Sequence, residues 1–187
     1  MKITRKGDDL IAKAKTFAVA AHGAIGQIRK YTGEPYVNHC ESVANLVREC
    51  ETASAEMISA AWLHDTVEDT DITPQLIAQE FGKEVANLVF WMTDISTLND
   101  GNREQRKRID RERWHGAPPS AQTVKLADLI DNTHSIVARD PEFAKIYVPE
   151  KRLLLKFLKQ GDQHLYTKAM SLVENLADII KITHDKV

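Results

Sequence analysis

Two histidines and two aspartates, placed far apart in the sequence, are the residues of this chain best suited to chemistry. They are His39, the adjacent pair His64 and Asp65, and Asp128. Each lies in a segment otherwise rich in apolar residues, where burying an imidazole or a carboxylate is costly unless a partner satisfies it. A metal ion is the simplest partner for all four. Two nitrogen and two oxygen ligands suit Mn²⁺, Fe²⁺ or Zn²⁺ better than Ca²⁺, and the lack of thiolates argues against a structural zinc site.

Two acidic residues follow the His64–Asp65 pair. Glu68 comes four residues after His64, and Asp69 comes four after Asp65, so a continuing helix would place both acids one turn beyond the pair. A run of acids is usually a solvated helix end, and that interpretation stays open here. Beside metal ligands, however, a carboxylate can orient water and carry its proton, which favours a functional role.

The segment from Ser120 to Arg139 predicts a long helix with one polar stripe. Lys125, Asp128, Asn132 and Ser135 are spaced three, four and three apart, so they share one face. Leucine, isoleucine, valine and alanine occupy most of the remaining positions, which is typical of a buried helix. The stripe then faces a cavity, a ligand or a metal, unless it is a polar edge in contact with solvent.

Two sets of basic residues have weaker signals. Arg29 and Lys30 lie in a glycine-rich loop before His39. Ordinary surface charge is the default for such a pair, and the functional alternative is a clamp for an anion or a base, because arginine both pairs with phosphate and stacks on rings. The basic segment from Arg103 to Arg113 is expected to be a largely solvated helix face, from which one or two residues reach an anionic substrate.

The elements that must position these residues are all predicted to be helices. Strand signals are nearly absent, and apolar residues recur with helical spacing between glycine and proline breaks. We therefore expect an all-α, single-domain bundle of several helices, with a buried metal site. The expected helices cover roughly 10–21, 37–50, 54–67, 74–81, 83–93, 102–114, 120–139, 149–159 and 162–183.

Length and composition narrow the class of protein. The 187 residues suit one domain, 1–187, with a substantial core. A net charge of −2 does not favour nucleic-acid binding, and the apolar runs are too short to cross a bilayer. The two cysteines, Cys40 and Cys50, lie in one expected helix and cannot staple a fold, which fits a reducing cytoplasm. No secretory signal pattern is visible, and the oligomeric state is not predicted.

Three motifs in one order resemble a known family. They are RKYTGEPYVNH (29–39), WLHDTVEDT (62–70) and VKLADLIDNTHS (124–135), and REQRKR (103–108) adds to the likeness. Together they resemble the hydrolase domain of the RelA/SpoT-type alarmone enzymes, which are HD-type metal phosphohydrolases. Because no synthetase or regulatory region accompanies them, the chain is most similar to the stand-alone small alarmone hydrolases, including the animal form.

The resemblance implies an all-helical fold, one Mn²⁺ ion, and removal of pyrophosphate from the 3′ position of guanosine tetra- and pentaphosphate, as in the stringent response. It assigns a role to each matching position. The metal ligands would be His39, His64, Asp65 and Asp128; the acidic pair that activates water would be Glu68 and Asp69; and the substrate contacts would be Arg29, Lys30, Asn132, Ser135 and Arg152. Lys125 fits the motif as a structural residue or a contact.

The chain departs from the family pattern at three positions of the third motif. Leu129 stands where the family has Arg or Lys, Asp131 where it has His or Tyr, and His134 where it has Arg. None of these changes removes a ligand or the acidic pair, but they leave the substrate open. The alternatives are a nucleotide phosphatase of the same superfamily, acting on an adenosine alarmone, NADPH or a deoxynucleotide, and a catalytically silent alarmone-binding module.

Overall fold

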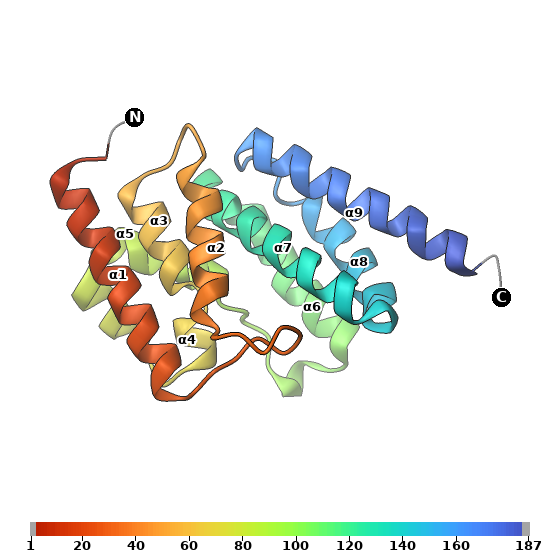
Figure 1. Ribbon diagram of the computed structural model, residues 1–187, viewed down its shortest axis with the longest axis horizontal. Coiled ribbons are helices and arrows are strands. Elements are labelled where there is room, and N and C mark those ends of the chain that lie inside the picture. Colours follow the sequence, from red (N-terminus) through yellow and green to blue (C-terminus); the bar gives the residue numbers. More distant parts are fainter. Residues whose placement is uncertain (1–2, 185–187) are drawn as a thin grey trace. The chain divides into compact units, whose positions relative to one another are not determined.

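The computed structural model describes residues 3–184, and these residues confirm the all-α class (Figure 1). Within this range the only extended pairing is an isolated bridge between Ile28 and Pro35. No described helix combines the length and the apolar character needed to cross a membrane. The chain divides into two compact units between Asp94 and Ile95, and each is described by itself.

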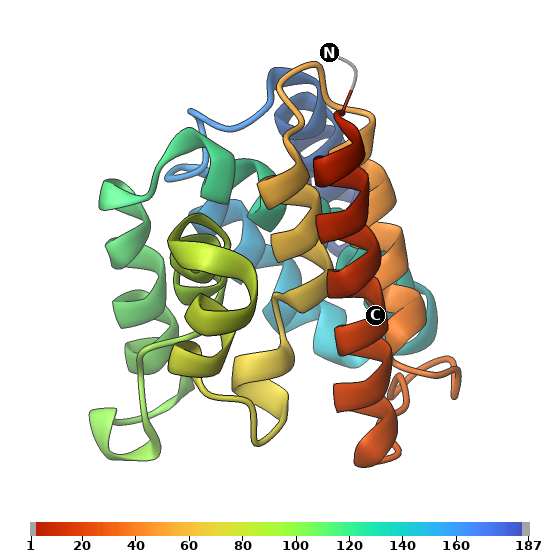
Figure 2. The same ribbon diagram turned by 90° about the vertical axis from the view of Figure 1, so that its left-hand side faces the viewer.

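The first unit is built from α1 to α5. Helix α3 is its centre, because α1, α2 and α5 all pack against it (Figure 2). Every residue of α3 from Met57 to Leu63 is buried, as the apolar run in the sequence predicts. Apolar side chains at helical spacing on α1 and α2, such as Ile11, Ala14, Val43 and Val47, close this core. The helix bounds are α1 Arg5–Ala24, α2 Val37–Arg48, α3 Ala55–Leu63, α4 Thr66–Asp69 and α5 Pro74–Met92.

Hydroxyl caps fix where several of these helices begin. The side chains of Thr4, Ser54 and Thr73 each accept a hydrogen bond from a backbone N–H in the first turn of α1, α3 and α5. Thr73 is followed by Pro74 at the first helical position, as expected. The expected stop at Gly82 is also present: its φ of 84° kinks α5 into two helical segments, a conformation that glycine adopts without strain.

One expectation for this unit is wrong, and the difference matters for the site. The sequence predicts one helix from Ser54 to Val67, whereas α3 ends at Leu63 and α4 begins at Thr66. Asp65, between them, has φ −100° and ψ −2°. The Thr66 side chain donates to the Leu63 carbonyl at 2.7 Å. It thereby satisfies a carbonyl oxygen at the C-terminal end of α3. The break therefore falls at the presumed ligand pair.

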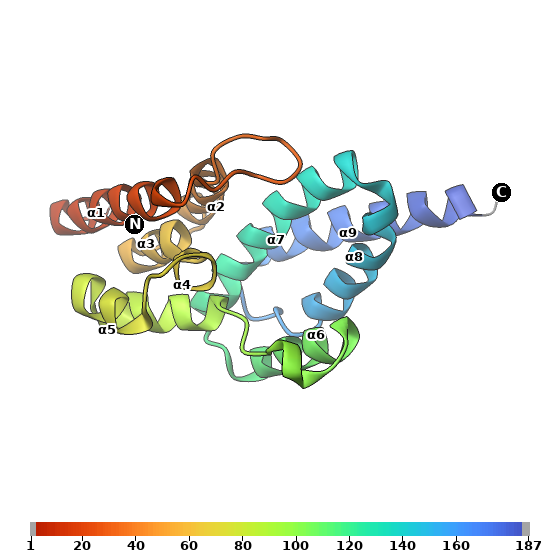
Figure 3. The ribbon, with the colours of Figure 1, turned by 90° about the horizontal axis from the view of Figure 1, so that it is seen from below.

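The second unit comprises α6 to α9 and two short 3₁₀ turns. Helices α7, α8 and α9 pack against one another, and α6 contacts α8 (Figure 3). Gly161, before α9, lies so close to α7 that an added Cβ would come within 2.7 Å of the Leu126 side chain. The bounds are η1 Leu98–Asp100, α6 Arg103–Glu112, η2 Arg113–Gly116, α7 Pro119–Arg139, α8 Pro141–Leu155 and α9 Gln163–His184.

Two helix starts in this unit differ from the sequence prediction. Helix α7 begins at Pro119 rather than at a cap by Ser120, because proline at the first position needs no N–H partner. Helix α8 begins at Pro141, capped by Asp140, and contains Pro149 within it instead of starting there. A proline inside a helix removes one backbone hydrogen bond, so the sequence favoured a break that α8 does not have.

Candidate metal centre

His39, His64 and Asp65 bring three ligand atoms together in the first unit. Their ligand atoms all lie within 4.8 Å of one another. The two histidine Nε2 atoms are 3.2 Å apart, and Asp65 Oδ2 lies 2.9 Å from His64 Nε2 and 3.7 Å from His39 Nε2. Both histidines are almost fully buried. The cluster comes from the start of α2 and from the break between α3 and α4.

The hydrogen bonding of His64 prepares it to bind a metal. His64 Nδ1 lies 2.8 Å from the Ala61 carbonyl oxygen, which can only accept, so Nδ1 carries the hydrogen. In its neutral form the ring then presents its Nε2 lone pair towards His39 Nε2 and Asp65 Oδ2. Two imidazole nitrogens and a carboxylate oxygen at this spacing are a donor set that one divalent cation can share, and a ring hydrogen bonded to a backbone carbonyl is the usual support of a metal-binding histidine. The residues therefore fit a divalent metal.

Asp65 is further held by Tyr36. The Tyr36 hydroxyl donates to Asp65 Oδ2 at 2.6 Å, and its ring packs edge-on against His39 with the ring centroids 5.5 Å apart. Tyr36 thus contacts two of the three clustered residues. A hydroxyl donor stabilises the charged carboxylate, which is the form that binds a metal.

The two acids of the expected pair lie on α4 and are held by different partners. Glu68 Oε2 accepts from the backbone N–H of Asp94 at 3.1 Å. Asp69 Oδ2 accepts from the side-chain amide of Gln27 at 2.8 Å. Asp69 is at the exposed edge of the cluster, yet partial burial of the carboxyl and the negative charge of Asp65 raise its pKa above the ordinary value, while the Gln27 hydrogen bond opposes that rise.

Arg29 and Lys30 lie at the turn of a hairpin-like loop between α1 and α2. The loop closes through Tyr36 N–H donating to Gln27 O at 3.0 Å and Arg29 N–H donating to Glu34 O at 2.8 Å. The Arg29 guanidinium lies over the Tyr36 ring, 5.9 Å from its centroid, and Lys30 is exposed. One loop therefore carries both the predicted base clamp and the tyrosine that holds Asp65.

The polar stripe on α7 lies in the second unit. Lys125 Nζ donates to Asp128 Oδ2 at 2.8 Å, and Asn132 Nδ2 donates to Asp128 Oδ1 at 2.6 Å. Ser135 donates to the Asn132 carbonyl at 3.1 Å. The shared face that the spacing predicts is thus present. Both Asp128 oxygens accept hydrogen bonds within its own unit, and its role as the fourth ligand stays a prediction.

The three departures in this motif occupy different environments. Leu129 is 1% exposed and belongs to the core of the second unit, so no cation stands at that position of α7. Asp131 is half-buried, and His134 is exposed. The absent family cation at position 129 is therefore the departure with the largest physical consequence, because an apolar side chain replaces a charge.

Two neighbouring basic residues on α8 point in different directions. Arg152 is exposed, and its Nε donates to Glu174 on α9 at 2.8 Å. Lys151 lies over the Tyr147 ring, 4.8 Å from its centroid. Burial, and then the positive charge of Lys125, lower the pKa of Lys151 to about 8, and the Asp128 carboxylate opposes that shift. Lys151, not Arg152, is therefore the cation of this helix that interacts with the Asp128 region.

Sequence reasoning missed Lys151, Gln27 and Tyr36 as candidates. For Lys151 a signal existed: Tyr147, Lys151, Leu154 and Leu155 follow a helical period that marks the buried face of α8. Tyr36 is inside the first quoted motif but was given no role. Nothing local marks Gln27, because its partner Asp69 is 42 residues away.

Known proteins place this chain in a family. The HD domain family matches residues 14–150, which lie in both units. The chain is 37% identical over 136 residues to the Xenopus tropicalis protein named guanosine-3′,5′-bis(diphosphate) 3′-pyrophosphohydrolase MESH1, over 71% of this chain and 73% of that protein. It is 38% identical over 136 residues to a Synechocystis protein named as a probable enzyme of the same kind.

A solved structure agrees with these sequence matches. It is described as a metazoan ortholog of SpoT that hydrolyses ppGpp, and it superposes with a TM-score of 0.79 at 26% identity, covering 94% of this chain and 97% of that one. Lengths differ among the relatives: the match spans 71% of this chain but only 17% of the longer Synechocystis protein. The chain belongs to the HD domain family, in the branch that contains the MESH1 guanosine-3′,5′-bis(diphosphate) 3′-pyrophosphohydrolases.

Proposed function

We propose that this protein hydrolyses the 3′-pyrophosphate of guanosine tetra- and pentaphosphate, giving GDP or GTP and pyrophosphate. The observation that carries the proposal is the convergence of His39, His64 and Asp65. Glu68 and Asp69 lie on α4, the short helix that directly follows Asp65. The names of the MESH1 relatives support the choice of substrate.

His39, His64 and Asp65 would hold one divalent metal, with Asp128 as the fourth ligand that the third motif predicts. We assign Mn²⁺, because the mixed nitrogen and oxygen set suits it and the resembling family uses it. When bound, the metal supplies positive charge that neutralises the phosphoryl oxygens in the transition state. Tyr36 would hold Asp65 oriented towards the metal.

Glu68 and Asp69 would take the proton of the attacking water. The water oxygen forms a bond to the phosphorus attached to the ribose 3′ oxygen, the bond between that phosphorus and the 3′ oxygen breaks, and the leaving oxygen regains a proton. Carboxylates serve as general bases when they lie within hydrogen-bond reach of water. Both acids are anchored by N–H donors, which leaves other lone pairs of each carboxylate for this task.

Arg29 and Lys30 would bind the nucleotide, the first by stacking on the purine and the second by pairing with phosphate. Asn132, Ser135 and Arg152 are further substrate contacts proposed from the third motif and from α8. The partner is then a small nucleotide rather than a nucleic acid or a membrane. Cys40 and Cys50 are not joined in a disulfide, which supports a cytoplasmic location.

A second candidate is a nucleotide phosphatase of the same superfamily. The observation that favours it is Leu129, a buried apolar residue where the resembling family has a cation. An altered charge on α7 is one way to change which phosphorylated nucleotide is accepted. This candidate would release orthophosphate instead of pyrophosphate.

One product assay separates the two. The Mn²⁺-loaded protein is incubated with ppGpp, pppGpp, the adenosine counterpart, NADPH and deoxynucleotides, and the released phosphate species are identified. We expect pyrophosphate from ppGpp with the highest kcat/KM. Orthophosphate from NADPH or a deoxynucleotide as the main product would overturn the proposal, and binding of ppGpp without turnover would indicate a silent binding module.

A further inference from the structure

The loop between α1 and α2 carries a glutamine whose backbone is fixed on both sides. Gln27 N–H donates to the His22 carbonyl at 3.0 Å, and the Gln27 carbonyl accepts from Tyr36 N–H at 3.0 Å. These bonds tie Gln27 to the end of α1 and to the start of α2. The orientation of its side-chain amide therefore depends on the two groups at its ends.

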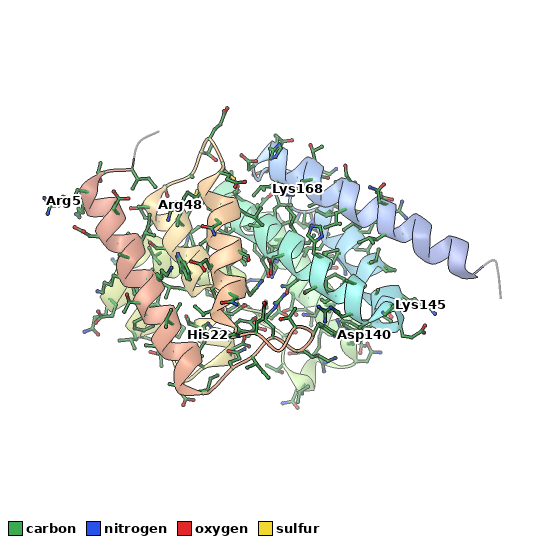
Figure 4. All side chains as sticks on the ribbon, viewed as in Figure 1. Arg5, His22, Arg48, Asp140, Lys145 and Lys168 are labelled. Carbon is green, nitrogen blue, oxygen red and sulfur yellow. The ribbon has the colours of Figure 1, made fainter. Side chains whose placement is uncertain are left out.

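His22 lies at one end of that amide. It is 1% exposed, at the C-terminal end of α1 beside the loop (Figure 4), and its Nδ1 is 2.6 Å from Gln27 Oε1. An amide oxygen only accepts, so Nδ1 carries the hydrogen. The ring packs against Tyr36 with centroids 5.0 Å apart, while Nε2 is buried with no hydrogen-bond partner among the described residues. A buried polar atom of this kind disfavours folding, which indicates a reason other than stability for the histidine.

Asp69 lies at the other end. Gln27 Nε2 donates to Asp69 Oδ2 at 2.8 Å. A carboxamide has a donor at one end and an acceptor at the other, so the orientation that suits an Nδ1–H on His22 is the one that donates to Asp69. With the amide reversed, its oxygen would face the carboxylate and repel it. His22 and Asp69 are therefore coupled through one amide.

We propose that His22 and Gln27 are positioning residues that hold the Asp69 carboxylate for proton transfer. The contacts from His22 through Gln27 to Asp69 form a positioning relay. With Oδ2 engaged by the amide, Oδ1 is directed to the attacking water. This inference rests on the proposed function, in which Asp69 acts with Glu68 to accept that proton. Partners that orient a catalytic or metal-binding group typically contribute about 10- to 100-fold to activity when removed, and a carboxylate misplaced by about 1 Å loses a comparable factor.

The test compares His22→Leu with His22→Asn, two side chains of similar size. Leucine removes the donor, whereas the asparagine amide nitrogen can stand where Nδ1 stands. With ppGpp and Mn²⁺, we expect His22→Leu and Gln27→Leu to lower kcat about 10- to 100-fold, with KM and Mn²⁺ occupancy unchanged. His22→Asn should recover most of kcat. In an Asp69→Asn background, His22→Leu should cause no further loss, because both act through one carboxylate.

A second readout does not need turnover. Nitrogen NMR of the histidine rings, with diamagnetic Zn²⁺ in place of Mn²⁺, reports which nitrogen of His22 carries the hydrogen. We expect the Nδ1–H form in the unmodified protein and loss of that preference in Gln27→Leu. The same form in both proteins would overturn the relay whether or not ppGpp is the substrate.

The kinetic outcomes separate the two proposals. No pyrophosphate release by the unmodified protein contradicts the proposed function, and the ring tautomer then decides on the relay alone. Normal turnover with an unchanged kcat in His22→Leu contradicts the relay alone. A fall in kcat that His22→Asn does not recover, accompanied by loss of Mn²⁺, would make His22 a core residue.

Discussion

His39 Nε2 and His64 Nε2 face each other across 3.2 Å, in a site where both rings are buried. Two nitrogen ligands about 2.1 Å from a common ion would be roughly 3.0 to 3.4 Å apart, depending on whether the ion is octahedral or tetrahedral. The distance between the two rings therefore matches that of two ligands of one metal.

Replacing His64 or Asp65, two of the three clustered ligands, should abolish metal binding. Losing an outer partner of a ligand already costs about 10- to 100-fold in metal affinity, so His64→Ala and Asp65→Ala should cost more than about 100-fold. Metal analysis and the rise in Tm on adding Mn²⁺ would measure this. His164→Ala, an exposed histidine on α9, is the matched control and should bind metal normally. Full Mn²⁺ occupancy in His64→Ala would remove the assignment. The same measurements on Asp128→Ala test the fourth ligand: loss of Mn²⁺ binding would support Asp128, and normal binding would contradict it.

Glu68→Gln should separate metal binding from chemistry. The amide oxygen of glutamine can still accept the Asp94 N–H, so α4 stays anchored, but the side chain no longer takes a proton. We expect unchanged Mn²⁺ occupancy and KM, with kcat lowered on the order of 100-fold. Near-normal kcat would leave Asp69 as the sole proton acceptor.

Arg29→Ala should weaken nucleotide binding without disturbing the metal. Arg29 packs on Tyr36 at the loop turn and is not one of the three clustered ligands. Its stacking on a purine would act in the ground and transition states alike. We expect KM to rise about 10-fold with kcat nearly constant. Arg48→Ala, an exposed arginine at the end of α2, is the control and should leave KM unchanged. An equal KM in the two variants would make Arg29 ordinary surface charge.

Lys151→Met should stabilise the metal-free protein, and the gain should depend on pH. The pKa of Lys151 is about 8 when folded and about 10.5 when unfolded, so the unfolded state binds more protons between these values. The destabilisation caused by burying charged Lys151 is therefore fully present below pH 8, and it disappears as pH rises towards 10.5. Each pKa unit is about 1.4 kcal/mol, so Lys151→Met should add about 1 to 3 kcal/mol to the free energy of unfolding at pH 7.

Arg152→Met is the matched control for this pair. Its ion pair with Glu174 is exposed, and such pairs contribute only about 0 to 1 kcal/mol. Denaturant unfolding at pH 7 and pH 10 would compare both variants. In kinetics, a raised KM for ppGpp in Arg152→Met would support the substrate contact proposed for Arg152, and an unchanged KM would contradict it. A pH-independent gain in stability from Lys151→Met would contradict the depressed pKa of Lys151.

Local rules predicted much of the fold. Apolar spacing identified the buried faces of α3 and α7, and Thr73–Pro74 and Gly82 marked real boundaries because capping and positive φ are properties of a few adjacent residues. Pro149 misled the prediction because packing of α8 against α7 and α9 outweighs one missing hydrogen bond. The break at His64–Asp65 was missed because the surrounding residues favour a helix and only the ligand arrangement requires otherwise.

The site residues likewise fall into those that local sequence predicts and those that only contacts between distant segments reveal. His39, His64 and Asp65 are found together because their residue types alone demand a shared partner. Gln27 and Tyr36 were not foreseen because their roles exist only through contacts across 42 and 29 residues of sequence. Arg152 and Lys151 differ by one position, and only the helical phase of α8 tells which of the two faces Lys125 and Asp128.

The loop between α1 and α2 has a consequence for how such an enzyme changes its substrate. Within ten residues it carries Gln27, which contacts Asp69, Tyr36, which contacts Asp65, and Arg29, which is proposed to bind the base. A substitution at Arg29 that changes which base is bound would therefore alter the same loop that aligns the Asp65 and Asp69 carboxylates. Exchanging this loop between relatives should transfer substrate preference and turnover together. Changes in specificity should arise more readily on α7, where they leave Asp65 and Asp69 undisturbed.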